Sequence, residues 1–187
     1  GMSDGAAALV VTRPEIAKKS KHKDDYAVTK ANALAINSFL PMYRASFDWL
    51  GFPSTQAAAE LAYQEAGIKN PAEEIDLAEV HDCFTITEIL NCQDLQFCEQ
   101  GEGAKFVREG HAEVDGKVPV NPSGGLKCFG HPIGASGLRM LYEMYLQFQG
   151  LAGERQLEDP RFGLTHNLGG FPAMNVCSIS IVGRYEG

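Results

Sequence analysis

The sequence predicts an α/β domain built on a mixed β-sheet. Apolar runs of strand length alternate with stretches of helical periodicity along most of the 187 residues, and this alternation is typical of α/β domains. Two apolar runs lie close together near the end of the chain, which predicts a closing pair of strands. An apolar content of 44% is enough for a substantial core in one domain, or in one and a fraction.

The first quarter of the chain is expected to contribute two strands. Residues 5–11, GAAALVV, are small and then β-branched, as in a strand buried on both faces. Residues 14–25 are polar and predict a short helix and a linker, which contains the basic cluster Lys18–Lys23. Residues 26–37 then predict a central strand, and residues 40–51 predict an irregular aromatic segment.

The middle of the chain predicts a helix, a strand and a second helix. The first helix is expected over residues 53–67, because Pro, Ser and Thr open an alanine-rich stretch that ends in glycine. A short strand over residues 75–80 runs directly into the tetrapeptide HDCF, His81–Phe84. Helical periodicity follows from Thr85 to Glu99. The strand therefore delivers four chemically unusual residues to the start of a helix.

The last part of the chain contains a glycine-rich loop. Residues 102–120 are mixed in character, and His111 among them is expected to face solvent. The stretch Asn121–Gly137, NPSGGLKCFGHPIGASG, holds five glycines and two prolines and precedes a helical pattern that runs to about Gln149. Strands are expected over residues 161–170 and 174–182, and the first of them runs into glycines.

The loop presents one imidazole, that of His131, near the start of the following helix. Pro132 fixes its own φ and biases His131 toward an extended conformation. Gly130 and Gly134 permit turns that are closed to other residues. A histidine held in this way can accept a proton or donate a hydrogen bond, although a glycine-rich loop with a purely structural histidine would have the same pattern.

Composition narrows the classes of function. The net charge of −8 argues against a nucleic-acid surface, and no apolar run approaches the roughly 18 residues of a membrane span. The five cysteines show no CxxC spacing, which favours free thiols in a reducing compartment over a disulfide framework. Together with the absence of a signal-peptide pattern, this predicts a cytoplasmic protein.

Three segments should converge on one edge of the sheet, because ligands gather outside the carboxyl ends of strands. They are His81–Phe84, His131 and His166–Gly170. A histidine base, a thiol acid and backbone N–H groups in glycine-rich turns suit acyl chemistry. The alternative is a zinc site made from the three histidines, Asp82 and Cys83, although none of the usual close ligand spacings is present.

Four motifs resemble the thiolase superfamily, in that family's order and along nearly the whole chain. They are SDGAAALVV at Ser3, HDCF at His81, NPSGGLKCFGHPIGASG at Asn121 and THNLGG at Thr165. The resemblance implies the C-terminal half of a five-layered αβαβα subunit, with helices on both faces of the mixed sheet. Residues 1–24 would be the last strand of the family's first half plus a linker, and residues 25–187 would be the thiolase C-terminal domain.

HDCF together with HN-x-G is similar to the sterol-carrier-protein type of thiolase. The resemblance implies that His131 activates the nucleophile, that Cys83 takes the acid/base role and that His81 supports the oxyanion site. It also implies that Asn167 and Gly169 position the thioester oxygen. Phe84 would pack against the pantetheine arm of the substrate, although a core phenylalanine fits the sequence equally well. No cofactor is implied, because acyl-coenzyme A is itself the substrate.

The family's nucleophilic cysteine lies in its first half, and no cysteine precedes Cys83 here. Cys92, Cys98 and Cys177 lie in helical or strand patterns, which leaves Cys128 as the one substitute worth testing. The chain alone is therefore expected to lack turnover. It should need a missing N-terminal half or a companion chain, and it should self-associate.

Three functions fit this sequence. The first is the C-terminal half of a thiolase-like acyltransferase that acts on acyl-coenzyme A and 3-ketoacyl-coenzyme A thioesters. The second is a retro-aldolase that cleaves a β-hydroxyacyl thioester on the same scaffold, since that reaction needs an acid/base but no acyl-cysteine. The third is a non-catalytic assembly module, because a half-domain with an exposed sheet face would seek a partner.

Overall fold

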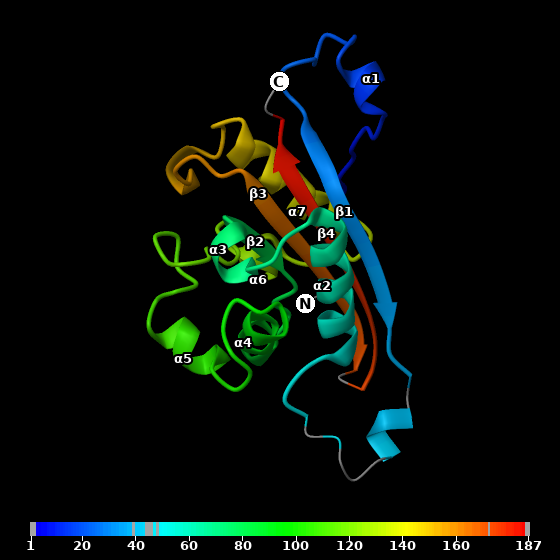
Figure 1. Ribbon diagram of the computed structural model, residues 1–187, viewed down its shortest axis with the longest axis vertical. Coiled ribbons are helices and arrows are strands. Elements are labelled where there is room, and N and C mark those ends of the chain that lie inside the picture. Colours follow the sequence, from blue (N-terminus) through cyan, green and yellow to red (C-terminus); the bar gives the residue numbers. More distant parts are fainter. Residues whose placement is uncertain (1–2, 39, 44–46, 48, 172, 186–187) are drawn as a thin grey trace.

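A computed structural model describes residues 3–38, 40–43, 47, 49–171 and 173–185 of the chain. Within them, the elements follow one another as helices and strands with short connections (Figure 1). They are α1 Pro14–Ala17, β1 Ala27–Ile36, η1 Leu40–Tyr43, α2 Pro53–Ala66, α3 Pro71–Glu74, β2 Leu77–Val80, α4 Thr85–Asp94, α5 Gly103–Arg108, α6 Gly125–Phe129, α7 Ser136–Phe148, η2 Gly153–Arg155, β3 Phe162–Phe171 and β4 Met174–Arg184.

The four strands form one mixed sheet in the order β1-β4-β3-β2. β4 pairs antiparallel with β1 and β3, whereas β2 runs parallel to β3. A single bridge between Ala78 and Val120 extends the sheet beyond β2. Helix α2 packs on one face and α7 lies on the other, as Figure 1 shows in front of the strands and behind them. The predicted mixed α/β fold with helices on both faces is confirmed.

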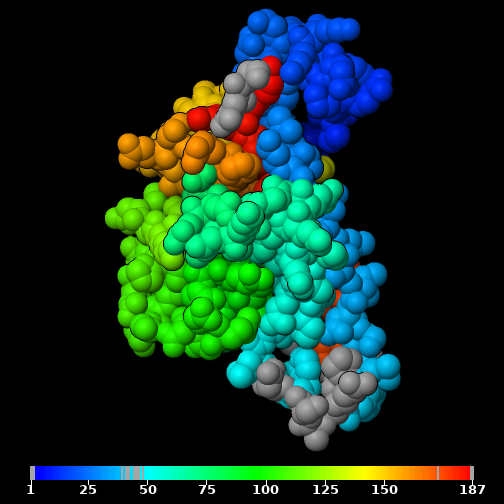
Figure 2. Space-filling model, viewed as in Figure 1, coloured from blue at the N-terminus to red at the C-terminus, as the bar shows by residue number. Residues whose placement is uncertain are grey.

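The main core lies between α2, the sheet and α4. Alanines of α2 approach β1 and β4 closely, because Ala58, Ala59 and Ala62 are fully buried and small. A second, smaller cluster joins α7 to the other face through Met144 and Val182. In Figure 2 the surface over α2 and the green segments around residues 70–110 forms one continuous body, and the blue N-terminal residues stand at its upper end.

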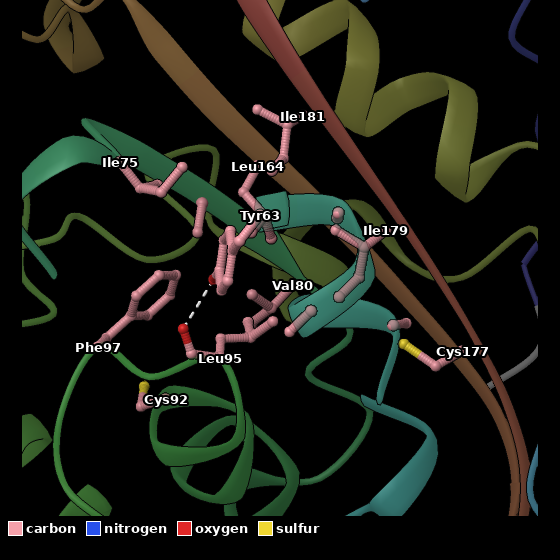
Figure 3. Packing of buried hydrophobic residues seen from close by; sticks show 14 of the residues in the cluster. Tyr63, Ile75, Val80, Cys92, Leu95, Phe97, Leu164, Cys177, Ile179 and Ile181 are labelled. Carbon is pink, nitrogen blue, oxygen red and sulfur yellow. Dashed lines mark hydrogen bonds between the residues drawn. The ribbon is translucent and has the colours of Figure 1, made fainter. Parts of the chain in front are cut away.

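Tyr63 carries a polar group into the main core. Its hydroxyl donates to the carbonyl of Leu95 at 2.7 Å, which joins α2 to the end of α4 (Figure 3). Burial raises the pKa of Tyr63 far above its ordinary value, so the group stays a donor. We expect Tyr63→Phe to lower the free energy of unfolding by about 1–3 kcal/mol, because the Leu95 carbonyl loses its partner in a dry site. Urea unfolding measures the change, and Tyr142→Phe on the exposed side of α7 is the control; an equal loss in both would contradict the assignment.

Several predicted elements differ from those in the structure. Residues 5–11 are extended but pair with no strand among the described residues, and Val10 is 96% exposed. Their apolar, β-branched sequence favours a strand, but a strand also needs a ladder partner. The predicted central strand over residues 26–37 is β1, which lies at the edge of the sheet, because β4 is its only partner in the part of the chain that the structure describes. The assignment of residues 1–24 to the family's first half stays a prediction.

One predicted helix ends early, and one helix was not predicted. The predicted helix over Thr85–Glu99 ends at Asp94, because Gln96 takes a left-handed conformation with φ +61° and the chain turns to bury Phe97. The glycine-rich loop contains the short helix α6, which the sequence did not indicate. Part of the predicted irregular segment, residues 44–46 and 48, lies outside the described residues.

Candidate functional site

His131 lies on a loop that is constrained by its own glycine and proline and by contact with the N-terminal segment. Gly130 has φ +76°, and a side chain there would collide with Ser3. The Ser3 hydroxyl accepts the backbone N–H of His131 at 3.2 Å. The N-terminal segment therefore crosses the loop. Residues 3–7 and Pro132–Ala135 line a shallow groove of about 420 Å³ beside the histidine.

A chain of hydrogen bonds assigns the tautomer of His131. The Ser136 hydroxyl, at the first residue of α7, lies 2.7 Å from His131 Nδ1 and donates its single proton to the Pro132 carbonyl at 3.2 Å. With this proton on the carbonyl, we infer that Ser136 accepts from Nδ1–H, which leaves a lone pair on Nε2. The sequence predicted that the His131 ring would lie near the start of a helix. The residue of that helix that contacts the ring is Ser136.

We expect Ser136→Ala to convert the single His131 tautomer into a mixture, because Nδ1–H loses its acceptor. Nitrogen-15 spectra of the imidazole rings measure the tautomer directly. The half-exposed ring of His111 serves as an internal control and should keep its signals. An unchanged His131 spectrum in the variant would show that Ser136 does not select the tautomer.

His81 follows β2 and meets His131 edge to face. The ring centroids lie 5.1 Å apart with an interplanar angle of 73°. Burial, followed by the repulsion of His131, lowers the pKa of His81 to about 4, although Asp82 acts in the opposite direction. His81 is thus a neutral histidine at pH 7. It can donate one hydrogen bond or accept one without carrying charge into the site.

Asp82 is a structural member of the HDCF tetrapeptide. Its carboxylate accepts the backbone N–H of Leu126 at 2.8 Å, and the chain at Gly125 passes so close that a side chain there would collide with the carboxylate. Gly125 also has φ +60°, a conformation that favours glycine. The glycine-rich loop is therefore attached to the HDCF segment at its own first turn.

Cys83 and Phe84 lead from β2 into α4. The Cys83 thiol is half-buried, and its sulfur lies 3.7 Å from the Thr87 hydroxyl. Its carbonyl accepts from the Lys127 ammonium at 2.9 Å. Phe84 is 67% exposed, which excludes the core alternative in this structure and leaves its ring free to contact a ligand. Cys83 and Phe84 thus combine a partly accessible thiol with an open aromatic surface.

Asn167 and Gly169 lie on β3, on the face of the sheet that also carries α7. The Asn167 amide approaches Gly137 so closely that a Cβ there would be 3.2 Å from Nδ2. Asn167 is therefore placed beside the first turn of α7, which also holds His131. Gly169 is exposed and pairs with Val176 two residues further along the strand. The rings of His81 and His131 are in contact with each other, and Gly169 takes no part in that contact.

His166 does not join the site as its sequence position suggested. It is fully buried in the middle of β3 and pairs with Val80. Its Nδ1 accepts the His81 N–H at 3.4 Å, and its Nε2 therefore donates to the Thr55 hydroxyl at 3.0 Å. Burial, with His81 adding to it, lowers the pKa of His166 to about 3. It supports the backbone of His81 from the core.

The remaining cysteines offer little as nucleophiles. Burial raises the pKa of Cys98 to about 11 and of Cys177 to about 12, and it raises the pKa of Cys92 further. Cys128 is exposed on α6. Among the described residues, no group of three or more His, Cys, Asp or Glu side chains is placed to hold a metal ion, so the zinc alternative has no ligand set there.

Sequence reasoning missed the residues that position the histidines. Ser3, Thr55 and Ser136 each bond to a histidine through one hydroxyl. The signal for Ser136 was available, since a serine five residues after His131 opens the following helix. Ser3 and Thr55 lie more than 100 positions from their partners in sequence.

No helix in the described part of the chain is long and apolar enough to cross a membrane.

Known proteins match the chain in sequence and fold. The family model for "Thiolase C-terminal domain-like" matches residues 41–182. An acetyl-CoA acetyltransferase of Methanothermobacter thermautotrophicus is 42% identical over 90% of this chain and 43% of its own length. Sterol carrier protein 2 of Oryctolagus cuniculus is 36% identical over 89% of this chain and 30% of its own length.

A third relative is the benzoylsuccinyl-CoA thiolase subunit BbsB of Thauera aromatica, which is 37% identical over 91% of this chain and 43% of its own length. A solved structure, described as an Ltp2-ChsH2(DUF35) aldolase, shares the fold with a TM-score of 0.70 at 24% identity, over 86% of this chain and 40% of that one. The chain thus spans less than half the length of these relatives. With its motifs, its sheet and its matched residues in agreement, the chain belongs to the thiolase family as a C-terminal domain.

Proposed function

We propose that this chain supplies the acid/base half of a thiolase-type acyltransferase that acts on acyl-coenzyme A thioesters. The observation that carries the proposal is the His131–His81 pair, in which Ser136 leaves the Nε2 atom of His131 available as a base. The names of relatives, an acetyl-CoA acetyltransferase and a benzoylsuccinyl-CoA thiolase subunit, support the substrate class.

In thiolytic cleavage, His131 Nε2 accepts the proton of a nucleophilic thiol from the missing half. The thiolate attacks the keto carbon of a 3-ketoacyl thioester, and the bond between C2 and C3 breaks. The Cys83 thiol then gives its proton to the enolate carbon, which releases acetyl-coenzyme A and leaves the shortened acyl group on the nucleophile as an acyl-enzyme. A second coenzyme A thiol, deprotonated in the site, takes the acyl group. His81 and the protonated His131 would donate to the developing oxyanion.

One face of the sheet exposes apolar side chains that a partner could cover. Leu34 and Ile36 on β1 are 62% and 75% exposed, and Val176 on β4 lies opposite Ile36 on the same face. Residues on that face alternate with the buried ones beneath α2, and Gly169 of the proposed site pairs with Val176. In the described residues, α7 covers only the other end of this face. The partner would therefore cover apolar surface next to the proposed site.

The occupant we propose is the N-terminal half of a thiolase, either in a longer chain or as a companion chain. Ile36→Lys should weaken co-purification with that half by at least tenfold, since a buried, unpaired charge would enter the contact. Leu61→Lys, at a 52% exposed position on α2 at the opposite face, is the matched control. Equal binding by both variants would place the contact elsewhere. Self-association of this chain through the same face would appear as a dimer that Ile36→Lys dissociates.

The experiment for the activity compares this chain alone with the same chain joined to that half. We expect no acetoacetyl-coenzyme A cleavage from the chain alone and measurable cleavage from the joined protein. Sustained turnover by the chain alone would overturn the argument for a missing nucleophile. A trapped acyl-enzyme would support acyl transfer, whereas cleavage of a β-hydroxyacyl thioester without one would support the lyase. Complete inactivity of a folded, joined protein would support the assembly module.

We also propose a cytoplasmic location for this chain, because its five cysteines are free thiols, as is usual in a reducing compartment. An exposed Cys128 beside the site would be vulnerable to oxidation elsewhere.

A further inference from the structure

Arg139 on α7 contacts three segments that meet at the proposed site. Its guanidinium forms an ion pair with Glu79 of β2 at 2.9 Å and donates to the Ser123 hydroxyl at 3.0 Å. It also lies over the Phe129 ring, with 4.7 Å between its Cζ atom and the ring centroid. None of these residues is assigned a role in the mechanism above.

Both carboxylate oxygens of Glu79 have partners at the buried end of the cluster, whereas the buried Arg139 Nε has none among the described residues. Glu79 is 0% exposed, and its carboxylate also accepts the Ser123 hydroxyl at 2.7 Å and the Ser123 N–H at 3.2 Å. The Ser123 oxygen in turn accepts the N–H of Gly125. The planar guanidinium forks between a carboxylate and a hydroxyl, a geometry that a lysine could not reproduce. The buried end therefore fixes Arg139 in one orientation.

Each of the three segments leads directly to a site residue. Glu79 lies on β2, two residues before His81. Ser123 begins the loop that ends at His131, and Phe129 lies two residues before that histidine. Arg139 belongs to the first turn of α7, whose opening residue Ser136 holds the His131 ring.

We propose that Arg139 is a positioning residue that holds His131 against His81 by clamping the Ser123–Phe129 loop at both ends. Left-handed glycines open this segment at Gly124 and Gly125 and follow it at Gly130, so the backbone can turn freely on either side of α6. The guanidinium over the half-exposed Phe129 ring restrains the loop two residues before His131, in addition to the direct contacts of Ser3 and Ser136. The clamp acts on the ring's position, while Ser136 selects its tautomer.

The test uses ring-to-ring nuclear Overhauser contacts between His81 and His131 in this chain. Phe129→Leu removes the stack but leaves Glu79, Ser123 and Arg139 in place, so a folding defect is not expected. The matched control is Tyr142→Leu, because Tyr142 and Phe129 are both 51% exposed. We expect the contact to be lost or weakened severalfold in Phe129→Leu and to be kept in Tyr142→Leu.

A second readout is the titration of His81. Because proximity to His131 contributes to its lowered pKa, release of the loop should raise the pKa of His81 toward its ordinary value. Arg139→Lys keeps the charge beside Glu79 but not the planar stack, and it should shift both readouts in the same direction as Phe129→Leu. Wild-type contacts and titration in a folded Phe129→Leu chain would overturn the proposal. This result does not depend on the proposed reaction, since both measurements are made without substrate.

Discussion

Replacing Cys83 with alanine in the protein completed by the missing half is expected to lower the rate of condensation or cleavage by about 10²- to 10⁴-fold. A thiol can exchange a proton near neutral pH, whereas the amide of Asn167 cannot. Cys83 is half-buried beside the entry to α4 and adjoins the open ring of Phe84. The proposed role of protonating a carbanion needs a thiol that is not sealed in the core, and Cys83 meets this condition. Steady-state assays in both directions measure the effect.

Two variants distinguish this role from positioning. Asn167→Ala should reduce the rate less than Cys83→Ala, because it removes an oriented amide beside Gly137 but no proton transfer. Cys128→Ala should leave most of the activity, since that thiol is exposed on α6. A Cys83→Ala enzyme with near-normal turnover, together with a dead Cys128→Ala enzyme, would move the chemistry to the glycine-rich loop.

The second large effect expected is a loss of stability on acidification, caused by the two buried neutral histidines. The pKa values of His81 and His166 are lowered to about 4 and about 3 in the folded chain. An unfolded histidine binds a proton below about pH 6.5. Between these limits the unfolded state holds more protons than the folded one, so stability falls as the pH falls. Each histidine then costs about 1.4 kcal/mol for each pH unit below 6.5.

Urea unfolding between pH 7.5 and pH 5 measures this slope. His166→Gln should lower stability at pH 7.5, because the bonds to Thr55 and to the His81 N–H change, but its pH dependence should be flatter by one proton. Comparing slopes also separates His166 from Glu79 and Glu88, whose burial-raised pKa values act in the opposite direction. A wild-type slope in His166→Gln would refute the assignment to that residue.

Local sequence was sufficient for the parts of the site that lie at the ends of strands and helices. The run that became β2 leads directly to His81 and Cys83, and Gly130 and Pro132 constrain the backbone on either side of His131. The helix α2 was predicted to within a residue, because proline at its start and glycine at its end act on adjacent positions. Such signals need no contact with distant residues.

The sequence by itself thus determined the mixed α/β fold, and it predicted candidate site residues on the HDCF and glycine-rich segments with a proposed role in acyl transfer. Only the tertiary structure decided which strand lies at the edge, that residues 5–11 find no partner among the described residues, and that His166 is buried behind His81. It also placed the Ser136 hydroxyl against Nδ1 of His131. Burial, strand order and hydrogen bonds across the fold depend on residues far apart in the chain, and no local pattern encodes which of them will meet.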